Sequence, residues 1–387
     1  MKTGFKVKLL TASLITALPL AAFAQSTTGS IFGQAPAGTH GTVVIESQSG
    51  VRRELPVGEN GRYQSPQLPV GTYRVLLTRD GDVVEEKGNV TLKVGSNIEV
   101  SFAGVERDVQ ELGGIEVTGS TVAPIDVSSV DSRTVITMDQ LSRLPLGRSS
   151  EAIALLAPGV VSNSGNFRSA TGNSLVSFGG SAASENAYYI NGFNTTDPLK
   201  GLGGLTLPYG AIDQQEIYTG GYSAQYGRSD GGVINAVGRR GTNEWHFGAQ
   251  MIWQPAFLRE NMDDVRYENG LPQSPVAGDM YWPRSHDSYS SSTVSAYAGG
   301  PLIKNKLFFF AAVEHERTKG NSLGDVSSSY PYLDYRNSQP RWYAKLDWNI
   351  NDNNILELTG ASDKLGTRGS VYDYDFSSLQ RDRKSVV

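Results

Sequence analysis

A strict two-residue alternation, which begins shortly after Gly241, is the feature that most constrains the fold. In the stretch "WHFGAQMIW", residues 245–253, apolar side chains alternate with polar or small ones, and only Ile252 breaks the pattern. Successive side chains of a β-strand point to opposite faces, so this segment predicts a strand with one apolar and one polar face. We expect the apolar set to face lipid and the polar set to face an interior, and the apolar set is Trp245, Phe247, Ala249, Met251 and Trp253.

The pattern recurs in "STVSAYAGG" and "RWYAKLDWNI", and a further run, "ILELTGAS", begins after the second of these. The segment "LFFFAAVEHER" predicts a strand that is apolar on both faces in its first half. Strands of about ten residues, joined by alternately tight and long polar connections, are typical of a transmembrane β-barrel. Tryptophan at the strand ends agrees with this, because aromatic side chains gather at membrane interfaces. A soluble barrel or sandwich, whose strands also alternate, is the alternative.

Composition excludes several classes of site. The chain of 387 residues has no cysteine, which rules out disulfides, Cys-ligated zinc, iron–sulfur clusters and thiol catalysis. A net charge of −5 without a concentrated basic block argues against a nucleic-acid partner. Neither a phosphate-binding loop nor a His-Glu-x-x-His pair occurs, and we expect no cofactor and no metal site.

The N-terminus predicts export. Lys2, Lys6 and Lys8 precede the apolar run "LLTASLITALPLAAFA", which ends in a small-x-small cleavage site. We therefore expect a signal peptide over residues 1–24 that is cut after Ala24. An uncleaved anchor is the alternative, but the run is shorter than the roughly 20 residues that a spanning helix needs.

The rest of the chain divides by composition into five segments. Short strands punctuated by Gly and Pro predict an antiparallel sandwich, a polar linker follows, and a glycine-dense stretch predicts an α+β unit. The fold class is mainly β. The expected boundaries are 25–104 for the sandwich, 105–130 for the linker, 131–240 for the α+β unit and 241–381 for the first barrel strands. Residues 382–387, "DRKSVV", are expected to be a non-native tail.

Local signals predict elements inside the α+β unit. Thr137 and Ser149 or Ser150 are N-cap residues for two short helices, which Pro145 and Pro158 end. The dipeptide Asn191-Gly192 predicts a tight hairpin.

Within the linker, "IEVTG" is an alternating β-prone pentapeptide without a local partner. Such a strand can add itself to the sheet edge of another protein, where backbone hydrogen bonds provide the affinity. An ordinary linker strand is the alternative on the residues alone.

Several longer motifs carry a family resemblance. The stretch "NGRYQSPQLPVGTYRVLL" resembles the carboxypeptidase-regulatory-type sandwich, which is an accessory domain without peptidase activity. The segments "SFGGSAASENAYYINGFNTTDP", "LPYGAIDQQEIYTGGYSAQYGRSDGGVINAVGRRGTNEWHFG" and "GGPLIKNKLFFFAAVEHER" resemble the plug domain and first barrel strands of TonB-dependent outer-membrane receptors, Oar-like subgroup.

This resemblance implies a location and partners. It implies the outer membrane, a periplasmic N-terminal domain, and the energy-transducing complex of TonB with ExbB and ExbD. It also implies outer-membrane lipid and a small-molecule, saccharide or peptide substrate. The resemblance favours the interpretation that "IEVTG" adds itself to the sheet of a partner protein. In this family that segment is the TonB box, which here consists of Ile115, Glu116, Val117, Thr118 and Gly119.

The resemblance also implies roles for glycines and for the length of the chain. Gly220, Gly221, Gly231 and Gly232 are expected to allow tight turns and close approach to the barrel wall. Only about five strands follow the plug, too few to close a barrel, so we expect the chain to be a fragment.

Three hypotheses for function follow. The first is energy-coupled import, the second an outer-membrane adhesion or structural barrel without transport, and the third a secreted soluble β-rich enzyme. The sequence gives the third no catalytic support. Ser229 lies in "GRSDG", which matches a Gly-x-Ser-x-Gly elbow, but such an elbow needs a strand before it and a helix after it.

Overall fold

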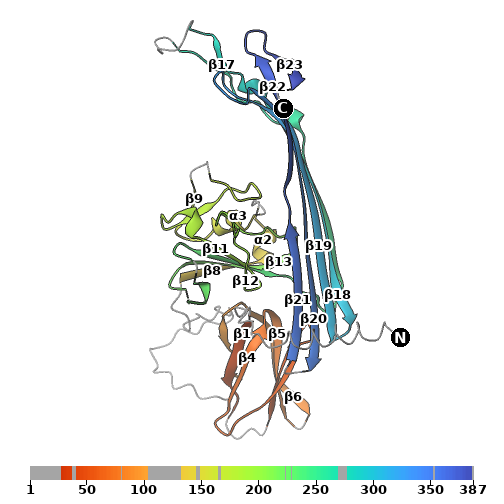
Figure 1. The fold of residues 1–387 in the computed structure, drawn as a ribbon. Coiled ribbons are helices and arrows are strands. Elements are labelled where there is room, and N and C mark those ends of the chain that lie inside the picture. Colours follow the sequence, from red (N-terminus) through yellow and green to blue (C-terminus); the bar gives the residue numbers. More distant parts are fainter. Residues whose placement is uncertain are drawn as a thin grey trace, which may run out of the picture.

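The computed structural model describes most of the chain in three units (Figure 1). A small sandwich lies below a mixed α+β unit, and a tall sheet of long strands runs alongside both. The described residues are 28–36, 41–79, 81–102, 132–144, 149–163, 167–222, 224–227, 229–268, 277–351 and 354–385. The predicted signal peptide and linker therefore lie outside them.

Two sheets form the N-terminal sandwich, as the Gly- and Pro-punctuated strands predict. In the described residues one sheet has the order β4-β1-β7 and the other β3-β2-β5-β6. Their facing sides bury a core around Ile31, Ile45 and Val75. The strands are β1 (Thr28–Gln34), β2 (Thr42–Ser47), β3 (Arg52–Pro56), β4 (Arg62–Pro69), β5 (Gly71–Arg79), β6 (Asp82–Leu92) and β7 (Asn97–Glu99).

The α+β unit contains a mixed sheet of five described strands in the order β12-β11-β14-β13-β8. Strands β11 and β14 are parallel, and the other pairs are antiparallel. Its elements are β8 (Ser132–Thr137), α2 (Met138–Ser142), α3 (Ser150–Ala154), β9 (Val160–Ser162), β10 (Val176–Phe178), η1 (Ala183–Glu185), β11 (Ala187–Ile190), β12 (Phe193–Asn194), β13 (Ile212–Gly220), η2 (Ala224–Tyr226) and β14 (Val233–Gly238).

The N-cap and turn signals of this unit are confirmed, whereas Pro145 lies outside the described residues and α3 ends at Ala154, before Pro158. Thr137 and Ser149 are the N-cap residues of α2 and α3, and the Ser149 side chain accepts a hydrogen bond from Ala152 N. Asn191 and Gly192 both have positive φ angles, 49° and 79°, between β11 and β12. Two positive φ angles are typical of the tight I′ turn that this dipeptide favours.

One antiparallel sheet contains the long strands, and we call it the wall sheet. Its described strands have the order β15-β18-β19-β20-β22-β23, and β21 pairs with the other half of the β20 edge. The strands are β15 (His246–Gln254), β18 (Ser288–Ile303), β19 (Leu307–Leu323), β20 (Tyr332–Asn351), β21 (Asn354–Asp363), β22 (Gly366–Asp375) and β23 (Gln380–Ser385). The long β15–β18 connection contains η3 (Ala256–Leu258), β16 (Val265–Arg266), β17 (Met280–Trp282) and η4 (Arg284–His286).

The two faces of the wall sheet meet different surroundings. Phe247 on β15 is 81% exposed, whereas Tyr343 on the opposite face of β20 is 1% exposed and packs against the α+β unit. Between residues 340 and 350, the outward positions of β20 are Pro340, Trp342, Ala344, Leu346, Trp348 and Ile350. The structure thus confirms that alternate residues of these strands lie on two different faces, one exposed and one packed against the α+β unit. An exposed apolar area of this extent indicates a membrane or protein contact.

No helix among the described residues is long and apolar enough to cross a membrane. At the other end of the chain, residues 380–385 pair with β22 as strand β23, and residues 386 and 387 lie outside the described part. The interpretation of 382–387 as a non-native tail stays a prediction.

Candidate functional site: the junction between plug and wall

The α+β unit and the wall sheet share one hydrophobic core. Phe310, Ala312 and Tyr343 on the inner face of the wall belong to the same buried cluster as Ile190 and Ile234 of the α+β unit. Apolar burial of this kind is non-directional, so it holds the unit against the wall without fixing its position. Polar contacts around this core fix the position of the α+β unit against the wall sheet.

Asn191 connects the tight turn of the unit to three backbone or side-chain groups. Its amide nitrogen donates to Tyr343 OH and to Thr359 Oγ1, both at 3.2 Å. Its Oδ1 accepts a hydrogen bond from Gly238 N at 2.8 Å. Sequence analysis identified Asn191 as a turn residue only, because its partners Tyr343 and Thr359 lie more than 150 positions away along the chain.

Arg341 on β20 is the centre of an ion-pair cluster on the inner face. Its guanidinium lies 2.5 Å from Glu314 Oε1, 3.2 Å from Asp363 Oδ1 and 3.3 Å from Glu316 Oε2. The side chains of Arg341, Glu314 and Asp363 are 6%, 1% and 1% exposed. Buried carboxylates of this kind require a paired cation, because an uncompensated buried charge is strongly destabilising.

The same carboxylates hold the backbone of the α+β unit. Glu314 Oε2 accepts a hydrogen bond from Tyr209 N at 3.2 Å, and Asp363 Oδ2 accepts one from Thr206 N at 3.1 Å. Hydrogen bonds to charged groups are worth about 1.5–3 kcal/mol, more than neutral ones. The Arg341 cluster therefore fixes the loop before β13 to the wall.

A second cluster lies where the chain passes from the unit into the wall. Arg240 is 3.3 Å from Asp347 Oδ1 and 3.5 Å from Glu357 Oε1. Lys345 is 3.6 Å from the same Asp347 atom and 3.1 Å from Glu357 Oε2. Together with Asn191 and the Arg341 cluster, these residues define what we call the plug–wall latch.

The glycines that touch the wall differ from those expected. Gly221 has a positive φ of 68°, which confirms a turn role, and Gly220 has no atom near its absent side chain. A Cβ at Gly231 or Gly232 would meet Ser181 or Phe178, inside the unit, so the prediction that they approach the wall is wrong. Among the described glycines of the α+β unit and its connection to β15, those whose Cβ would meet the wall are Gly210, Gly238 and Gly241, and Gly50 of the sandwich meets it too.

Ser229 is not held as a nucleophile. Its Oγ lies 2.9 Å from Gly232 O and 3.1 Å from Glu185 O, and it also contacts Tyr222 OH. Strand β14, rather than a helix, follows it. The Gly-x-Ser-x-Gly match is therefore part of a turn that backbone carbonyls stabilise. The predicted TonB box, Ile115 to Gly119, lies outside the described residues.

Glu151 is a buried acid inside the unit, in the first turn of α3. It is 3% exposed, and its Oε2 has no hydrogen-bond partner among the described residues. Burial raises the pKa of its carboxyl to about 6 from the usual 4.5. The folded unit therefore binds the proton more tightly than the unfolded chain does, and stability falls as pH rises from about 4.5 through 6.

We expect the substitution Glu151→Gln to stabilise α3 at pH 8 by about 2 kcal/mol, the equivalent of this pKa difference. Hydrogen exchange of the α3 amides should slow roughly 30-fold at pH 8, with little change at pH 4.5. A matched substitution of the exposed Glu185→Gln should leave both values unchanged. An equal effect of Glu151→Gln at both pH values would contradict this assignment.

Comparison with known proteins assigns the unit. Residues 126–234 match the family described as TonB-dependent Receptor Plug Domain. The α+β unit is thus similar to the plug domain of TonB-dependent receptors. It is 30% identical over 397 residues to the TonB-dependent transporter Oar of Myxococcus xanthus, a match that covers 91% of this chain and 35% of Oar. The resemblance to Oar-like TonB-dependent receptors is confirmed, and the chain spans about a third of the length of that curated relative.

Solved structures give weaker similarity. The outer membrane transporter YddB from Escherichia coli is 16% identical, with a TM-score of 0.43 over 62% of this chain and 37% of its own. The siderophore receptor PirA from Acinetobacter baumannii is 20% identical, with a TM-score of 0.42 over 64% of this chain and 35% of its own.

Proposed function

We propose that this chain is part of an outer-membrane transporter that imports a small molecule, saccharide or peptide when TonB pulls on its plug. One observation carries the proposal: buried, ion-paired carboxylates on the inner face of a sheet accept hydrogen bonds from the plug backbone, and the outer face of that sheet is exposed and apolar. A plug that is attached by separable polar contacts suits a gate that opens and closes again.

The chain order suggests how force reaches the plug. The linker with the predicted TonB box leads directly into β8, which is an edge strand of the plug sheet and pairs only with β13 in the described part. Arg133 on β8 also donates to Val94 O and Gly95 O of the sandwich, both at 3.2 Å. Strand β8 is therefore the first part of the plug to receive a pull on the linker.

The energy source is adequate for this task. Breaking the two hydrogen bonds from Tyr209 N and Thr206 N to the buried carboxylates costs about 3–6 kcal/mol. One elementary charge that crosses the inner membrane at 100 mV releases about 2.3 kcal/mol. About two or three protons, coupled through the ExbB and ExbD complex, would therefore release this loop of the plug from the Arg341 cluster. No enzymatic step and no cofactor enter this mechanism.

The alternative without transport is an outer-membrane adhesion or structural barrel. Removal of residues 115–119 from the complete protein separates the two functions. We expect the deletion to abolish binding of the periplasmic domain of TonB, because strand addition depends on these backbone groups. Deletion of residues 106–110 in the same linker is the matched control. If the protein with the 115–119 deletion reaches the cell surface in normal amount and still binds TonB, the result would favour the adhesion or structural barrel.

A further inference from the structure

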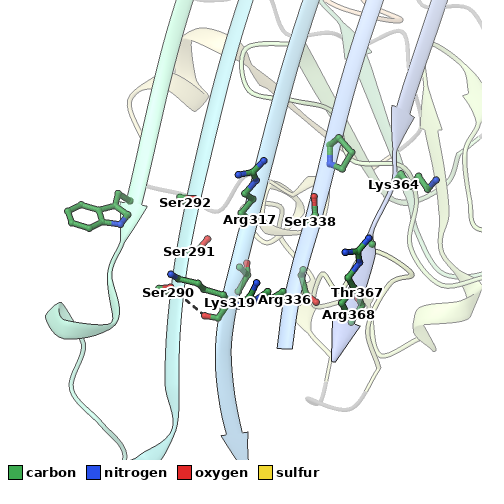
Figure 2. Close-up of a pocket in the computed structure, with 15 residues that line it drawn as sticks. Ser290, Ser291, Ser292, Arg317, Lys319, Arg336, Ser338, Lys364, Thr367 and Arg368 are labelled. Carbon is green, nitrogen blue, oxygen red and sulfur yellow. Dashed lines mark hydrogen bonds between the residues drawn. The ribbon is translucent and has the colours of Figure 1, made fainter. Parts of the chain in front are cut away.

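Five cationic side chains gather on the outward face of the wall sheet, at the end away from the sandwich (Figure 2). They come from β19, β20, β22 and the connection between β21 and β22, and they surround a surface hollow of about 940 Å³, which Trp253 and Ser292 also line. We call them the outward basic cluster, and they are Arg317, Lys319, Arg336, Lys364 and Arg368.

Strand register places three of these cations side by side. Lys319 is directly opposite Arg336, and Arg336 is directly opposite Arg368. Directly opposite residues in antiparallel strands have Cβ atoms about 4.5–5.5 Å apart, and like charges there are destabilising. The inward neighbours at the same height are the neutral Thr318, Asn337 and Thr367, so the positive charge is confined to the outward face.

The described residues supply no counter-charge to the cluster. None of the residues that line the hollow is acidic, and none of the five cations has an ion pair with a described residue. The next outward acid along β20 is Asp334, whose Oδ2 is 2.7 Å from Arg381. Three adjacent cations without an acid repel one another, and an anion from outside the chain would relieve this repulsion.

The height of the cluster on the sheet indicates which anion this is. On β19 the outward residues run from Leu307 through Phe309 and Val313 to His315, and the cations Arg317 and Lys319 follow at once. On β15 the apolar set ends at Trp253. The apolar face of β15 spans eight residue steps, about 27 Å along the strand, which is close to the height of a lipid-facing band. The cations thus begin where the apolar band stops.

We propose that the outward basic cluster binds the phosphate groups of a phosphorylated glycolipid in the outer leaflet. The inference goes beyond the proposed transport function and depends on it only for the orientation of the sheet in the membrane. Three guanidinium groups provide forked donors that fit phosphate oxygens. A substrate in the lumen cannot reach these side chains, because their strands turn them to the side opposite the plug.

The test uses the complete protein in neutral detergent, titrated with bis-phosphorylated lipid A and followed by native mass spectrometry. We expect Arg336→Gln with Arg368→Gln to weaken lipid A binding roughly 10-fold or more, since two charge-assisted contacts are lost. The matched control is Lys304→Gln with Lys306→Gln, two exposed cations in the turn at the other end of the sheet, and it should bind as the native protein does.

Thermal stability gives a second measurement that a fold defect would not reproduce. Without lipid, the Arg336→Gln, Arg368→Gln protein should melt at a higher temperature than the native protein, because cross-strand repulsion is relieved. With saturating lipid A the native protein should gain more stability, because it binds the ligand more tightly.

Three results would overturn the inference. They are equal lipid A binding by native and doubly substituted protein, equal binding of dephosphorylated lipid A, and competition by millimolar inorganic phosphate that shows a soluble anion site instead. Deletion of residues 115–119 should leave lipid A binding intact. A native protein that binds TonB but not lipid A therefore counts against this inference alone, and a native protein that binds lipid A but not TonB counts against the transport proposal alone.

Discussion

Replacing Arg341 by methionine is expected to destabilise the plug by about 3–5 kcal/mol, the largest effect of any substitution at the latch. The change leaves the side chains of Glu314 and Asp363, both 1% exposed, without their cation. Those carboxylates also hold Tyr209 N and Thr206 N, so the loop before β13 should separate from the wall. With a urea dependence of about 2 kcal/mol per molar, the midpoint for loss of plug protection should fall by roughly 2 M.

Two companion proteins show whether buried charge is the cause. Lys304→Met, an exposed cation in the turn between β18 and β19 without an ion pair to a described residue, should leave the midpoint nearly unchanged in detergent. Combining Arg341→Met with Glu314→Gln and Asp363→Asn removes the uncompensated charges and should recover most of the loss. If the combined protein is as unstable as Arg341→Met alone, packing of the arginine side chain is responsible instead.

Gly238→Ala is expected to cost about 1–3 kcal/mol through overpacking at the end of β14. The added Cβ would lie 2.1 Å from Tyr343 OH and 2.3 Å from its Cζ, and Tyr343 is 1% exposed. The tyrosine cannot turn aside without losing its hydrogen bond from Asn191. Faster hydrogen exchange in β13 and β14, and ion leakage through the complete protein in planar bilayers, should report the displaced plug.

The plug offers a matched control for this substitution. Gly220→Ala places its Cβ where nothing lies within 4 Å, and that residue does not have a positive φ. It should leave exchange and leakage unchanged. In a double-mutant cycle, Tyr343→Ala should reduce the cost of Gly238→Ala, because the two positions are in contact. Additive costs would show that the strain arises elsewhere.

Alternation predicted much of the fold because it is a local property of the strand. The faces of β15 and β20, the caps Thr137 and Ser149, and the turn at Asn191 depend on neighbours within a few residues. The outward basic cluster could not be predicted from the sequence for a related reason. Its cations are scattered between residues 317 and 368 and form no run, and only strand register brings Lys319, Arg336 and Arg368 together.

The latch could not be predicted, because its pairings join distant parts of the chain. The alternation in "RWYAKLDWNI" puts Arg341 and Lys345 on the same face of the strand. No sequence pattern assigns Asp363 to Arg341 or Asn191 to Tyr343. The glycine predictions failed similarly at Gly231 and Gly232. A glycine in a dense run indicates close approach, and only the packed structure shows what approaches it.

Strand β20 shows how unevenly the wall tolerates insertions and substitutions. Its 20 residues carry the buried Arg341, Tyr343 and Lys345 on one side and Trp342 and Trp348 on the other. Inserting a single residue upstream of Arg341 would exchange the two sides of everything beyond it, which would send the charges of Arg341, Lys345 and Asp347 into the apolar band and two indoles against the plug. Exchanges of one outward apolar residue for another should therefore be frequent among natural variants of this strand, whereas changes in its length should be confined to its connecting loops.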